Sequence, residues 1–108
     1  HKLIIHDWMN HTAFIKLVKN MNLGLQLSYT ESFNIVTADF VNSGIPILVS
    51  ESIYWMPELA KTSTINYDEV IHKIIQAHNI NKVLVKLSQR SLEAFNKQAK
   101  HIWNNYII

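Results

Sequence analysis

The sequence predicts an α/β fold in which short strands alternate with helices and form a partial parallel sheet. In the first half, apolar β-type runs alternate with segments of about ten residues that carry apolar side chains at helical spacing. Strands joined through helices form right-handed βαβ crossovers, which build parallel sheets. The second half is dominated by helical patterns. We therefore expect flanking helices and a long C-terminal helix.

Three apolar runs in the first half predict strands. They are Leu3-Ile4-Ile5, Leu23 to Leu27, and Ile45 to Ser50. The third run is apolar almost throughout, as strands covered on both faces of a parallel sheet tend to be. All three strands are expected to lie in one sheet.

Two helices are predicted between these strands. The first begins near Thr12 and ends at Asn22. The second runs from Phe33 into Asn42-Ser43-Gly44. Gly44 suits the left-handed position that follows a helix, and Pro46 cannot continue it.

Helices dominate the rest of the chain. A short strand is predicted near Thr62 to Ile65, followed by a helix that Asn66 or Asp68 caps. Apolar residues then recur every three to four positions from roughly Lys82 to Tyr106, which predicts the long final helix.

The composition is that of one globular domain, 1–108, and it excludes several classes of protein. The 108 residues are 48% hydrophobic, which excludes a disordered chain. There is no Cys, so a disulfide framework, an iron–sulfur cluster and a Cys nucleophile are excluded. The net charge is only +2 and Arg90 is the single arginine, which argues against nucleic-acid binding. No apolar run is long enough for a membrane span.

The polar segment between the second strand and the second helix is the candidate site. Ligands of open parallel sheets bind beyond the carboxyl ends of strands, and free N–H groups at a helix start favour a phosphate. Glu31 lies in this segment and Asp39 lies eight residues on, roughly 10–12 Å away along a helix. Both carboxylates would accept hydrogen bonds from hydroxyls.

A purely structural interpretation competes with this one. Ser28-x-x-Glu31 also fits a capping box, and Ser32 alone is a plausible N-cap. Asp39 would then be an ordinary exposed residue of the helix.

The run Ser28-Tyr29-Thr30-Glu31-Ser32-Phe33-Asn34 and its continuation resemble a known family. A strand ends in Ser, Glu-x-Phe follows, the next helix carries a second acidic residue, and Gly44-Ile45-Pro46-Ile47-Leu48 comes after it. This pattern is similar to the donor-binding region of retaining glycosyltransferases of the GT-B fold, the family 4-like group. The resemblance covers roughly Leu3 to Glu58, and Phe95 to Tyr106 looks like the C-terminal helix of such enzymes.

The resemblance implies a role for each matching residue. Glu31 falls on the catalytic-site Glu that contacts hydroxyls of the donor sugar, and Asp39 on the acidic residue that holds the ribose. Phe33, Asn34 and Ile35 match the stretch whose backbone amides meet the sugar and the diphosphate. Two positions depart from the pattern: Asp39 replaces a Glu, and Asn34 stands where many relatives carry Gly.

The resemblance also implies what the chain would need. It suggests the second half of a Rossmann-like C-terminal domain, a fragment of a longer protein whose N-terminal domain binds the acceptor. The family's Arg/Lys pair, which neutralises the donor diphosphate, has no counterpart here, so the piece alone is expected to be inactive. The substrate would be a nucleotide sugar, with no cofactor and no metal. A cytoplasmic location is expected because nucleotide sugars are usually spent there.

Other functions compete with a glycosyltransferase. One is a non-catalytic α/β module that binds a nucleotide or a protein, and another is a structural half-domain. His6 and His11 are five apart with no evident third ligand, so surface or capping roles are expected for them. Trp8, Trp55 and Trp103 are expected to pack against the sheet or an interface. An unpaired sheet edge invites self-association, which makes a homodimer a further hypothesis.

Overall fold

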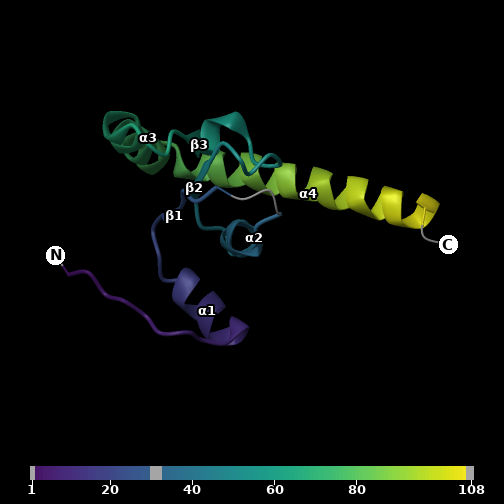
Figure 1. Cartoon of the computed structure of the whole chain (residues 1–108), viewed down its shortest axis with the longest axis horizontal. Coiled ribbons are helices and arrows are strands. Elements are labelled where there is room, and N and C mark those ends of the chain that lie inside the picture. Colours follow the sequence, from purple (N-terminus) through teal and green to yellow (C-terminus); the bar gives the residue numbers. More distant parts are fainter. Residues whose placement is uncertain (1, 30–32, 107–108) are drawn as a thin grey trace.

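The computed structural model describes residues 2–29 and 33–106, and these form an α/β fold with a parallel sheet (Figure 1). The predicted fold class is therefore confirmed. In chain order the elements are α1 (His11–Val18), β1 (Gly24–Gln26), α2 (Ile35–Asn42), β2 (Ile47–Ser50), the 3-10 helix η1 (Glu58–Ala60), β3 (Lys61–Thr62), α3 (Tyr67–Asn79) and α4 (Asn81–Tyr106).

The sheet has the strand order β1-β2-β3, and both pairs are parallel. Leu25 lies opposite Leu48, and Val49 lies opposite Lys61. All four residues of β2 are buried, as its almost wholly apolar sequence predicts for a central strand. β1 and β3 are the edges, and α2 is the crossover between β1 and β2.

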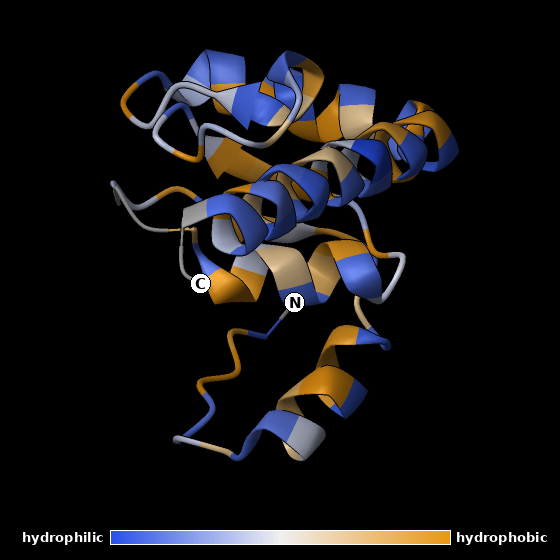
Figure 2. Cartoon of the chain, turned by 90° about the vertical axis from the view of Figure 1, so that its right-hand side faces the viewer, coloured by the Kyte–Doolittle hydropathy of each residue, from blue (hydrophilic) through white to orange (hydrophobic). Residues whose placement is uncertain are grey.

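The core lies between β2, α2 and the first half of α4. Ile47, Leu48 and Val49 are at most 1% exposed, and they pack in one cluster with Val41 of α2 and Leu84 of α4. The second half of α4 extends past the sheet (Figure 1). Figure 2 shows mostly hydrophilic residues on the side of α4 turned to the viewer, as expected for a helix with one buried stripe. No helix within residues 2–29 and 33–106 is long and apolar enough to cross a membrane.

The predicted strand Leu3-Ile4-Ile5 is wrong. Residues 2–10 contain no regular secondary structure, and Trp8, expected to pack, is 91% exposed. A strand is stable only where a neighbour pairs with its backbone. None of the described strands pairs with this run.

Other element boundaries also differ from the prediction. α1 ends at Val18 and passes into a turn, so Met21 lies outside the helix. β3 stops at Thr62 because the Ser63 hydroxyl accepts the N–H groups of Ile65 and Asn66, which turns the chain. Asn66 is the N-cap of α3, one of the two residues predicted for that role.

Candidate functional site

The candidate site lies where β1 leads into α2, at the carboxyl ends of the parallel strands. The buried hydroxyl of Ser50, at the end of β2, donates to the Ser28 carbonyl at 2.9 Å and lies 2.7 Å from the Ser52 hydroxyl. This contact ties the segment after β1 to the neighbouring strand. The sugar-binding residue expected from the resemblance, Glu31, lies outside the described residues, as do Thr30 and Ser32.

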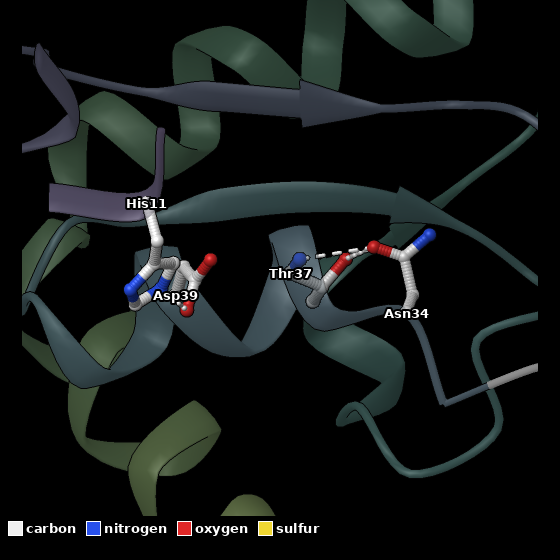
Figure 3. Close-up of polar contacts among 4 residues, drawn as sticks. All are labelled: His11, Asn34, Thr37 and Asp39. Atoms are coloured by element: carbon white, nitrogen blue, oxygen red, sulfur yellow. Dashed lines mark hydrogen bonds and ion pairs between the residues drawn. The ribbon is translucent and has the colours of Figure 1, made fainter. Parts of the chain in front are cut away.

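Asn34 is the N-cap of α2, and it has a left-handed backbone conformation with φ of 65° and ψ of 88°. Its side-chain Oδ1 accepts both the backbone N–H and the hydroxyl of Thr37, each at 2.9 Å (Figure 3). The cap of α2 is therefore Asn34, whereas Ser32 and the Glu31 member of the predicted capping box lie outside the described residues. The hydroxyl of Ser28 instead donates to Gln26 at 2.6 Å. Asn tolerates φ above zero better than Ser and also supplies the capping oxygen.

Phe33 anchors the chain directly before α2. Its carbonyl accepts the indole N–H of Trp55 at 2.7 Å, and its ring stacks on Trp55 and on Phe95 of α4 at centroid distances of 5.2 and 4.7 Å. Trp55 is buried, as expected, whereas Trp103 is exposed. One hydrogen bond and two ring contacts thus anchor the backbone that enters α2.

Asp39 is not the ordinary exposed residue that the structural interpretation predicts. Only 13% of its side chain is exposed, and its Oδ1 lies 3.2 Å from Nε2 of His11 in α1 (Figure 3). Phe14 and Phe40 pack edge to face beside this pair, at a centroid distance of 6.4 Å. In the sequence, His11 is conspicuous only through its spacing of five from His6, which does not suit a metal site. His11 and Asp39 are 28 positions apart, and no local pattern connects them.

The described site residues therefore lie along α2 and the residues that lead into it. Phe33 and Asn34 directly precede the helix, Ile35 is its first residue, and Asp39 lies five residues beyond Asn34, about 7.5 Å along the axis. The first N–H groups of a helix have no acceptor within it, and together with the helix dipole they attract an anion. The arrangement offers an anion-binding end and, farther along, a held carboxylate that accepts hydroxyls.

No cluster for a metal ion accompanies these groups. In the part of the chain that the structure describes, no three or more His, Asp or Glu side chains gather closely enough to hold one. The sequence matches no family model, no curated protein and no solved structure at a significant level. Functional assignment therefore depends on the residues and geometry described above.

Proposed function

We propose that this chain is the donor-binding part of a retaining glycosyltransferase with the GT-B fold. In the complete enzyme, a sugar would pass from a nucleoside diphosphate sugar to an acceptor. The observation that carries the proposal is the left-handed Asn34 at the start of α2. The resembling family often has Gly at this position, and φ above zero is the conformation for which Gly is favoured. Asn34 thus retains the backbone requirement while departing from the residue type.

The start of α2 is proposed to stabilise the diphosphate. Its leading amides and the helix dipole act on negative charge, which grows on the leaving group as the sugar bond breaks. Trp55 supports this role by holding the Phe33 carbonyl, which limits the movement of the amides that follow. Such fixed donors need little reorganisation during the reaction.

Asp39 is proposed to hold the ribose of the nucleotide. A carboxylate has two oxygens that together accept several hydrogen bonds, so His11 at Oδ1 leaves capacity for hydroxyls. Asp39 has a shorter side chain than the Glu of the resembling family. Its position is fixed by contacts with α1, because His11 and the Phe14–Phe40 contact hold this part of α2. Glu31, two residues before Phe33, is proposed to contact the donor sugar.

The proposal also requires an acceptor-binding domain and cationic groups near the diphosphate. β1 is an edge strand, so the outer side of the sheet is a place where further structure would pair. We propose that this edge pairs either with the remainder of a longer protein or with a second copy of the chain.

The test is donor turnover by the natural full-length protein over a panel of nucleotide sugars. We expect turnover of one donor, a severe loss in Glu31→Ala, and normal turnover in Glu93→Ala, an exposed control on α4. Turnover that survives in Glu31→Ala would contradict the proposed role of Glu31. Nucleotide binding without turnover of any donor would instead identify the non-catalytic binding module.

A further inference from the structure

A small polar pocket of about 150 Å³ lies at the carboxyl ends of all three strands. Tyr29 follows β1, Glu51 follows β2, and residues 62–65 close β3 and follow it, and these residues line the pocket. Three consecutive strands thus each contribute to one hollow. It is the edge of a parallel sheet at which ligands bind.

The lining has the chemistry of a site for hydroxyl groups. Of the described residues that line it, Glu51 is the one that carries a charge, and four others carry hydroxyls: Tyr29, Thr62, Ser63 and Thr64. Within residues 2–29 and 33–106, none of the ion pairs involves Glu51. A carboxylate only accepts hydrogen bonds, whereas hydroxyls both donate and accept.

This lining disfavours ions of either sign. Among the residues that the structure describes, no lysine, arginine or histidine lines the pocket, so a phosphate would meet the negative charge of Glu51 without a cation beside it. Hard cations such as Ca²⁺ take about six to eight oxygen ligands, commonly from several carboxylates, and one carboxylate is too few. A neutral ligand rich in hydroxyls fits both conditions.

The walls of the pocket are held by hydrogen bonds. Ser63 accepts two backbone N–H groups through its hydroxyl, and its own N–H donates to Glu69 of α3 at 3.2 Å. The Thr64 hydroxyl donates to the Tyr29 hydroxyl at 3.5 Å, which links the segments after β3 and β1. A pocket whose loops are ordered in this way loses less conformational entropy when it binds.

The volume of the pocket suits a ligand the size of a single sugar ring. Its volume equals that of about five water molecules in the liquid. Sites for drug-sized ligands are roughly 300–1,000 Å³, so a whole nucleotide sugar is too large. Tyr29 is 77% exposed and adds an apolar ring face with a polar tip at the mouth.

We propose that this pocket binds one neutral sugar ring, with hydroxyls of the sugar donating to the carboxylate of Glu51. The source of that sugar rests on the proposed function, in which Glu31, two residues after Tyr29, contacts the donor sugar. The ring belongs either to the donor or to the acceptor. Both sources present the same hydroxyl chemistry.

The test is a set of titrations of the ¹⁵N-labelled chain, followed by amide chemical shifts. The probes are neutral monosaccharides, nucleoside diphosphates and nucleotide sugars. We expect a monosaccharide to shift the amide signals of Tyr29 and residues 63–65. Glu51→Gln should weaken the binding of that monosaccharide about tenfold. Nucleoside diphosphates are expected to shift residues 34–36 and to bind Glu51→Gln normally. Glu93→Gln on α4 is the matched control for both ligands, and an unchanged amide spectrum elsewhere shows that each variant is folded.

The outcomes separate this inference from the proposed function. If nucleoside diphosphates bind but no sugar shifts the pocket amides, the sugar pocket is overturned and the donor site stands. If sugars bind the pocket and nucleoside diphosphates do not bind, the proposed diphosphate site at the start of α2 is overturned and the pocket stands. Binding of neither ligand overturns both. A nucleotide sugar that displaces the monosaccharide assigns the pocket to the donor, and simultaneous binding assigns it to the acceptor.

Discussion

Asn34 adopts a left-handed backbone conformation and caps α2 with its side chain, and separate substitutions distinguish these two roles. Asn34→Gly keeps the left-handed backbone and loses the cap, which costs only a few tenths of a kcal/mol. Asn34→Ala loses the cap, about 1 kcal/mol, and also loses the polar side chain that makes Asn more tolerant of the left-handed region than Ala, which adds up to about 1 kcal/mol. We therefore expect Asn34→Ala to lower the free energy of unfolding by about 1–2 kcal/mol in urea titrations. Asn96→Ala, at an exposed position of α4, is the control. Equal stability of the Gly and Ala variants would contradict the backbone role.

We expect the pair His11–Asp39 to affect ligand binding more than the stability of the fold. His11 is 70% exposed, and pairs of this kind contribute up to about 1 kcal/mol to folding. If Asp39 holds the ribose, Asp39→Ala should weaken nucleoside diphosphate binding about tenfold or more, and His11→Ala severalfold by releasing the carboxylate. Titration calorimetry measures both, with His72→Ala of α3 as the exposed control. Unchanged affinity in Asp39→Ala would remove this residue from the site.

At the scale of elements, β1 and α2 meet at a position where only glycine fits. A Cβ on Gly24 would lie 2.6 Å from Cε1 of the Phe40 ring, which is too close for unbonded atoms. We expect Gly24→Ala to lower the free energy of unfolding by about 1–3 kcal/mol, as overpacking does. Adding Phe40→Leu should return part of that loss, because the smaller side chain leaves room. A double variant no more stable than Gly24→Ala would exclude this clash as the cause.

Gly44 provides a contrasting case in the same crossover. A Cβ there would meet nothing within 4 Å, but its φ is +75°. Gly44→Ala is therefore expected to cost about 1–2 kcal/mol through backbone strain alone. Phe40→Leu should not rescue it, and denaturant titration of the two double variants separates the mechanisms.

At the scale of the whole molecule, the exposed edge of the sheet is the feature that most affects behaviour in solution. Among the described strands, β1 pairs with β2 alone, and Leu25 in its centre is 51% exposed. We expect concentration-dependent association in sedimentation velocity, reduced by Leu25→Lys, since lysine protects edge strands from pairing. Ile71→Lys, at an exposed apolar position of α3, should leave association unchanged. A monomer at every concentration would contradict this prediction.

The sequence by itself determined the features whose causes are local. Gly44 marked the end of α2, and the cap of α3 was narrowed to Asn66 or Asp68, because a backbone angle and a cap depend on adjacent residues. The apolar run of β2 predicted its burial. Helical spacing predicted α4 with a start near Lys82, and the helix begins at Asn81. The alternation of strands and helices predicted the parallel sheet.

Only the tertiary structure decided the features that depend on residues far apart in the chain. The apolar run at Leu3 has the composition of a strand and lacks a pairing partner among the described strands. His11 reaches Asp39 across 28 residues, and Trp55 reaches the Phe33 carbonyl across 22. Hydrogen bonds and strand pairing of this kind arise from packing of whole elements, and local periodicity carries no information about which elements meet.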